Sequence, residues 1–74
     1  MQILEFELRD EYVELCNLLK LAGIADSGGR GKQMVAEGMI QVDGQPEGRK
    51  TAKIRAGQQV RCGDVMIKVL PNAR

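Results

Sequence analysis

Hydrophobic and polar residues alternate at the start of the chain and change to a helical spacing further on. Leu4, Phe6 and Leu8 alternate with glutamates, which predicts a strand with one buried face. We expect Asp10 to cap the helix that follows and Gly23 to end it. The apolar stripe of this helix has the i, i+3, i+4, i+7 spacing of an amphipathic helix: Leu15, Leu18, Leu19 and Ala22.

A second helix is predicted to begin at Ser27, whose hydroxyl can accept a capping hydrogen bond, and to end at Gly38. Its buried stripe is Gly31, Met34 and Val35. Because only a few residues separate the two helices, we expect them to pack as a compact helical hairpin.

The pattern returns to a period of two after the second helix. Ile40 and Val42 lead into Asp43-Gly44, a strong signal for a tight turn, and Gln45-Pro46 restricts the next segment to a sheet edge or a turn. A further strand around Ile54 would bury that side chain and direct its two basic neighbours the other way.

The last hairpin is predicted to turn at Gly63-Asp64, with glycine at the first central position. This turn sets Cys62 opposite Val65 and Val60 opposite Ile67 on one face. Together these elements predict an α+β fold in which a helical hairpin packs on a small, mainly antiparallel sheet.

Length and composition indicate one soluble domain over residues 1–74. No apolar run approaches the roughly 20 residues that span a bilayer, and the start of the chain lacks the features of a secretory signal. We therefore expect a cytoplasmic monomer with no membrane partner. Cys16 and Cys62 occupy apolar-patterned positions without metal-ligand spacing, so we expect two buried thiols, a redox or metal role being the minor alternative.

Catalysis is the weakest interpretation of this sequence. The chain has no histidine, no metal-ligand cluster and no activated nucleophile. A nucleotide-binding P-loop does not fit either, because Asp26 stands where it needs glycine and Gln33 where it needs Ser or Thr. We expect no enzymatic activity, no cofactor, no metal and no small-molecule substrate.

Charge is distributed unevenly along the chain. The net charge is +1, yet residues 1–26 carry two cations and six acids, a net of −4, while residues 27–74 carry nine cations and four acids, a net of +5. Such asymmetry suggests a polyanionic partner, although solvated surface charge is the commoner explanation of a single basic residue.

The basic half contains a run without acids between Gly48 and Cys62, and chance solvent exposure could also produce it. The run holds five cations: Arg49, Lys50, Lys53, Arg55 and Arg61.

Two glycines at the start of the second helix are the other unusual feature. Gly28 and Gly29 cost up to roughly 1 kcal/mol each relative to alanine. They would let a phosphate reach the free amides after Ser27, with Lys32 one turn further on. An equally good alternative is that they loosen a loop or admit close helix packing. Lys32 and Gln33 lie on the polar side near Gly29, whereas Arg30 lies toward the flank of the helix that also carries Glu37, so we favour Lys32 over Arg30 as a phosphate contact.

The segment from about Val13 to Arg61, about two-thirds of the chain, resembles the S-four RNA-binding domain, named after small-subunit ribosomal protein four. It looks most like the small free-standing members of the YbcJ type. The matching elements are Leu15 to Leu19, Gly23-Ile24, Ser27, Lys32 to Val35, Glu37-Gly38, Val42 to Gly44 and Ile54 to Val60 with Gly57. The resemblance implies a non-catalytic, ribosomal-protein-like RNA-binding domain built on a two-helix αL motif.

The sequence departs from the family pattern at two places. Gly28 and Gly29 stand where many members have arginine after the serine, and Gly31 stands where alanine is usual. The departure shifts the expected contacts toward the cations further on. The complete predicted RNA-binding set is Ser27, Gly28, Gly29, Arg30, Lys32, Gln33, Arg49, Lys50, Lys53 and Arg55.

The predicted partner is structured RNA, with ribosomal RNA as a candidate. Phe6 and Tyr12 are the only aromatic residues, so the chain cannot build stacking platforms for single-stranded bases, and recognition of phosphate backbone and shape remains. The alternative is a protein-interaction adaptor whose basic face meets an acidic protein partner.

Overall fold

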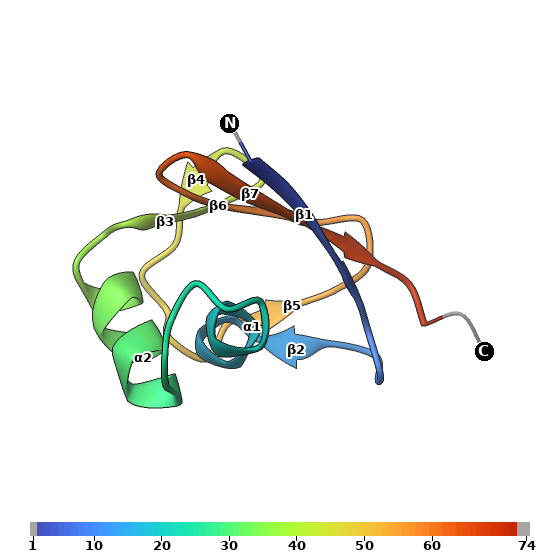
Figure 1. The fold of residues 1–74 in the computed structure, drawn as a ribbon, viewed down its shortest axis with the longest axis horizontal. Helices are drawn as coiled ribbons and strands as arrows, with labels where there is room; N and C mark the ends of the chain where they lie inside the picture. The colour runs from blue at the N-terminus through green and yellow to red at the C-terminus, as the bar shows by residue number, and fades with distance from the viewer. Residues whose placement is uncertain (1, 73–74) are drawn as a thin grey trace.

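Strands that are distant in the sequence build one five-stranded sheet with the order β1-β7-β6-β3-β4. The structure is a computed structural model that describes residues 2–72. Its elements are β1 (Gln2–Glu7), β2 (Val13–Glu14), α1 (Leu15–Leu21), α2 (Gly28–Ala36), β3 (Ile40–Val42), β4 (Gln45–Pro46), β5 (Lys53–Ile54), β6 (Gln59–Cys62) and β7 (Val65–Leu70). Figure 1 shows both helices and the small β2–β5 ribbon on one side of the sheet. The predicted fold class is confirmed.

One hydrophobic core lies between the helices and the sheet. The predicted stripes of both helices contribute to it, as do the inward faces of the strands. Its most deeply buried side chains are those of Leu15, Leu18, Leu19, Val35, Ile40, Ile54, Val60, Ile67 and Val69. Within residues 2–72, neither α1 nor α2 is long and apolar enough to cross a bilayer.

Strand β1 pairs in parallel with β7, while the other strand pairs of the sheet are antiparallel. Leu4 lies opposite Ile67 and Phe6 opposite Val69. The predicted alternation is confirmed, because Leu4 and Phe6 are half-buried, Leu8 is buried just after the strand, and the intervening glutamates are exposed.

Helix α1 begins at Leu15, so the prediction that Asp10 caps it is wrong. The residues just before the helix are extended instead, and Val13 and Glu14 pair with Ile54 and Lys53 in the β2–β5 ribbon. A strand of two residues carries no periodicity that would reveal it in the sequence.

Backbone carbonyls replace the missing side-chain cap of α1. The N–H of Leu15 donates to the carbonyl of Ala52 at 2.9 Å, and the N–H of Cys16 donates to that of Lys50 at 3.0 Å. The first amides of a helix have no intrahelical acceptor, so these two bonds satisfy donors that a capping side chain would otherwise serve. They also tie the loop before β5 to the start of α1.

The predicted second helix and hairpin are confirmed. The Arg30 N–H donates to Ser27 Oγ at 3.1 Å, so Ser27 caps α2. Gly23 and Gly38 follow the two helices with φ of +80° and +76°, the left-handed conformation that ends helices. Gly31 is buried where the helices meet.

The predicted turns also agree with the structure. Asp43 and Gly44 both have positive φ between β3 and β4. Cys62 lies opposite Val65 and Val60 opposite Ile67, as predicted.

The prediction of two buried thiols is only half correct. Cys16 is buried, but Cys62 is only partly buried because it ends β6 beside the exposed turn at Gly63. This partial burial raises the pKa of the Cys62 thiol.

Candidate nucleic-acid interface

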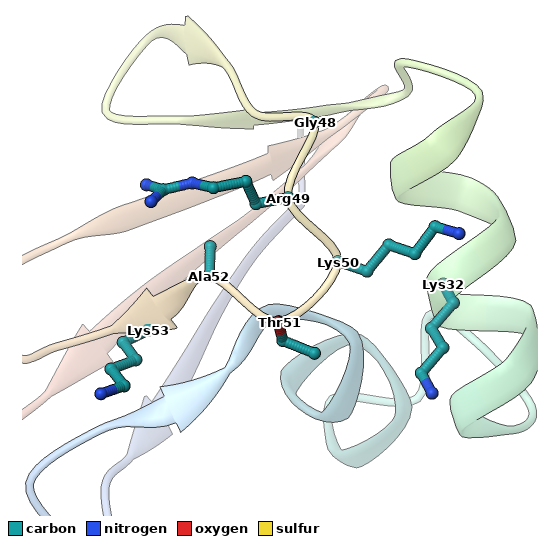
Figure 2. A pocket seen from close by; sticks show the side chains of 7 residues that line it. All are labelled: Lys32, Gly48, Arg49, Lys50, Thr51, Ala52 and Lys53. Atoms are coloured by element: carbon teal, nitrogen blue, oxygen red, sulfur yellow. The ribbon is translucent and has the colours of Figure 1, made fainter.

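A shallow groove lies between α2 and the loop that leads into β5, and we call it the basic groove. It is lined by Lys32, Gly48, Arg49, Lys50, Thr51, Ala52 and Lys53. Figure 2 shows Lys32 on the helix and the other residues along the loop and the start of β5. Four of the lining residues are cations and none is acidic. Cations from separate parts of the sequence therefore share one concave surface.

The backbone of Cys16 positions both walls of the basic groove. Its N–H donates to the carbonyl of Lys50 on the loop. On its other side it contacts α2 at Gly31, where a Cβ atom would lie 2.6 Å from the Cys16 oxygen. Only glycine permits this approach, because a side chain would collide with backbone. The two contacts hold the loop at Lys50 and the helix next to Lys32 against the same turn of α1.

The two cations at the centre of the loop point in opposite directions. In Figure 2 the Lys50 side chain extends toward α2, whereas the Arg49 side chain points away from it. Arg49 Nε lies 3.3 Å from Glu47 Oε2, and the Arg49 N–H also donates to that oxygen at 3.1 Å. The side-chain hydrogen bond from Arg49 is the main reason that the pKa of Glu47 is lowered.

The pairing distinguishes Arg49 from the lysines of the basic groove. Among residues 2–72, the Arg49–Glu47 contact is the only ion pair. Lys32, Lys50 and Lys53 therefore have no carboxylate within ion-pairing distance among the described residues, and their charges are available to an anion. Arg49 is 81% exposed in its side chain, but part of its charge is already balanced by Glu47.

Lys53 and Arg55 lie over the ring of Tyr12. Lys53 Nζ is 5.0 Å from the ring centroid, and Arg55 Cζ is 5.7 Å from it. Both cations are exposed and Ile54 between them is buried, as the sequence predicted. Arg55 does not line the basic groove itself but adjoins it through this ring. The sequence pattern did not predict the contact of Tyr12 with these cations, because it depends on the β2–β5 pairing.

The start of α2 lies outside the lining of the basic groove. Four of the predicted residues are on this segment: Ser27, Gly28, Gly29 and Arg30. Gln33, further along α2, is also absent from the lining. A Cβ atom on Gly28 would meet nothing within 4 Å, and one on Gly29 would meet only Ser27 Oγ at 3.9 Å. Close helix packing therefore does not explain these two glycines, and Gly31 is the glycine that it requires. The amides of Gly28 and Gly29 begin the helix and are the donors that intrahelical bonds leave free.

Arg61 is separate from the basic groove, although it belongs to the same acid-free run of sequence. It lies on β6, is exposed, and its Nε donates to the carbonyl of Gly63 at 3.3 Å. It lines a different, smaller hollow with Met39, Gln41 and Gly63.

The chain, with its two-helix hairpin beside a basic loop, also matches a known protein family. The profile of the S4 domain family matches residues 6–70, which is most of the chain. The chain belongs to the S4 domain family. The S-four resemblance predicted from the sequence is thereby confirmed.

Relatives of this S4 domain include two bacterial proteins. It is 48% identical over 59 residues to YbcJ of Escherichia coli (strain K12), whose name proposes RNA binding, and the match covers 80% of this chain and 84% of that protein. Identity and coverage are the same for YbcJ of Shigella flexneri, which is described as uncharacterized.

The fold of this S4 domain is also similar to a solved structure. The solution structure of YbcJ from E. coli has a TM-score of 0.72 and 42% sequence identity, with 95% of this chain and 90% of that chain covered. That structure is described as revealing an αL motif involved in RNA binding. The two-helix αL motif expected for this chain is confirmed.

Proposed function

We propose that this S4 domain is a non-catalytic RNA-binding protein and that the basic groove contacts the phosphate backbone of structured RNA. The observation that carries the proposal is the convergence of Lys32 with Lys50 and Lys53 on one surface without an acidic lining residue. The description of the αL motif in YbcJ as involved in RNA binding supports the same function. Ribosomal RNA is the candidate target.

The proposed contacts fall into two groups. Lys32, Lys50, Lys53 and Arg55 carry most of the binding, because none of them has a carboxylate partner among residues 2–72. Arg49 contributes less, since Glu47 already accepts its hydrogen bonds. The segment from Ser27 to Arg30, together with Gln33, would contact RNA at the edge of this surface, where the free amides at the start of α2 can donate to a phosphate oxygen.

The side chains on this surface are better suited to binding the phosphate backbone of RNA than to binding its bases. Phe6 is half-buried against the core, and the ring of Tyr12 is occupied by two cations. Proteins that hold single-stranded bases stack them on exposed aromatic rings. A surface of lysines and arginines instead binds the regularly spaced phosphates of a folded RNA.

Filter binding to an RNA hairpin over a salt series tests the proposal. Three to five phosphate contacts predict a loss of roughly a hundredfold in affinity between 50 and 200 mM salt. Replacing Lys50→Gln should weaken binding about uniformly across RNA sequences and reduce the salt slope by about 1. Lys68→Gln, at the exposed position of β7 and outside the basic groove, is the matched control and should bind like the wild type.

Failure to bind RNA even at low salt would refute the proposal. Capture of an acidic protein by the same surface, abolished by Lys50→Gln and retained by Lys68→Gln, would then favour the adaptor function.

A further inference from the structure

Tyr12 occupies a defined place beside the basic groove. In the β2–β5 ribbon, Val13 lies opposite Ile54, so extending this antiparallel register by one residue sets Tyr12 opposite Arg55. Lys53 is then the diagonal neighbour of Tyr12, and diagonal neighbours are within reach of aromatic and long side chains. Lys53 and Arg55 share one face because they are two residues apart on a strand.

The ring holds two like charges next to each other. The ammonium of Lys53 and the guanidinium of Arg55 are both within about 6 Å of the ring centroid, the range in which the negative face of an aromatic ring attracts a cation. The attraction offsets the mutual repulsion of the two cations. Glu14 lies opposite Lys53 in the register, yet among the described residues the two form no ion pair. Lys53 contacts the ring of Tyr12 instead.

We propose that Tyr12 is a positioning residue that holds Lys53 and Arg55 side by side so that both bind one phosphate of the RNA backbone. This inference rests on the proposed function of the basic groove, which Lys53 also lines. Long basic side chains lose rotamer freedom when they bind an anion. Ordering them beforehand on the ring reduces that loss, which increases affinity without adding a contact.

The Tyr12→Leu and Tyr12→Phe variants separate positioning from other roles. Tyr12→Leu keeps an apolar side chain without the ring and should weaken binding to an RNA hairpin about two- to fivefold. The salt slope should not change, because both cations remain. Tyr12→Phe keeps the ring and should bind like the wild type. In the wild type, the ring should shift the side-chain proton resonances of Lys53 and Arg55, and Tyr12→Leu should remove these shifts.

A double-mutant comparison decides whether the ring acts through the cations. In a Lys53→Gln, Arg55→Gln background, adding Tyr12→Leu should cause no further loss of affinity. A further loss of the same size would overturn the inference, because the ring would then contact RNA directly. Thermal unfolding of each variant identifies any loss that comes from unfolding, and Tyr12→Met serves as a second ring-free variant if Tyr12→Leu does not fold.

The outcomes also separate this inference from the proposed function. If the wild type binds RNA and Lys53→Gln weakens binding while Tyr12→Leu does not, the role of Tyr12 is wrong and the basic groove remains the RNA-binding surface. If the wild type does not bind RNA at low salt, the proposed function fails, and the inference that rests on it fails too.

Discussion

The backbone N–H of Cys16 donates to the carbonyl of Lys50, and this bond joins the basic loop to the first turn of the helical hairpin. The same residue contacts Gly31 on the second helix through its carbonyl group. The relative position of the loop cations and Lys32 therefore depends on how closely α1 and α2 pack at Cys16.

Replacing Gly31→Ala should destabilise the protein by about 1–3 kcal/mol, the usual cost of overpacking a core. The new Cβ would lie 2.6 Å from the Cys16 oxygen, so the helices must move apart. Thermal or urea unfolding measures the effect. Gly29→Ala is the matched control in the same helix, since its Cβ would have no contact closer than 3.9 Å, and it should be neutral or stabilising by up to about 1 kcal/mol. Equal stability of the two variants would contradict the prediction that the close approach at Gly31 excludes a side chain.

Changes at Ser27 should separate stability from RNA binding. Ser27→Ala removes the acceptor for the Arg30 N–H and should cost about 1 kcal/mol of unfolding free energy. Ser27→Asp keeps a capping acceptor, so its unfolding free energy should stay close to that of the wild type. Its negative charge should nevertheless weaken RNA binding in a filter assay. Wild-type affinity in Ser27→Asp would place the start of α2 outside the RNA interface.

Removing the partner of Arg49 should strengthen RNA binding. Glu47→Gln replaces the carboxylate that accepts the hydrogen bonds of Arg49 with a neutral amide, so the charge of the guanidinium is no longer balanced and attracts phosphate more strongly. The stability change should be small, about 1 kcal/mol or less, as for exposed ion pairs generally. Affinity measured at one salt concentration is the test, with Glu37→Gln at the C-cap of α2 as the control for lost negative charge. An equal gain in both variants would show a general charge effect.

The same pair should be visible in a pH titration. Because Arg49 lowers the pKa of Glu47 in the folded protein, the stabilisation from this pair is present above the ordinary glutamate pKa and is lost as the pH falls through the lowered value. Titration of the Glu47 carboxyl resonance by NMR should show this lowered pKa, and Arg49→Gln should move the pKa back toward its ordinary value. An unchanged pKa in Arg49→Gln would mean that another group is responsible.

The two thiols should react at different rates. Burial raises the pKa of Cys62, so less of the reactive thiolate is present at neutral pH than for a free cysteine. Cys16 is buried and should react only when the protein unfolds. Timed alkylation followed by mass spectrometry of peptides should therefore show slow modification of Cys62, later modification of Cys16, and rapid modification of both in urea. Faster reaction of Cys16 than of Cys62 in the native protein would contradict this order.

Local patterns predicted most of the individual elements. The Gly63-Asp64 turn gave the correct register of Val60 against Ile67, because turn type and alternation act over a few neighbouring residues. The cap at Ser27 followed from the same kind of short-range chemistry. The parallel pairing of β1 with β7 joins the two ends of the chain, and no local signal specifies which distant strand will be the partner.

The candidate site was predictable in composition but not in arrangement. The acid-free run identified Lys50 and Lys53, and helical geometry favoured Lys32. The run also included Arg61, which the structure places on another part of the surface. The Arg49–Glu47 pair and the contacts of Tyr12 with Lys53 and Arg55 depend on side-chain direction and on a two-residue strand, neither of which a periodic pattern encodes.

Mapping amide chemical shifts during titration with an RNA hairpin tests the central claim most directly, because it shows which surface the RNA contacts. We expect the largest changes at Lys32, at residues 48–53 and at Tyr12, with little change on the exposed face of the sheet at Arg61 and Lys68. Largest changes at Arg61 and Lys68, with the basic groove unaffected, would contradict the account.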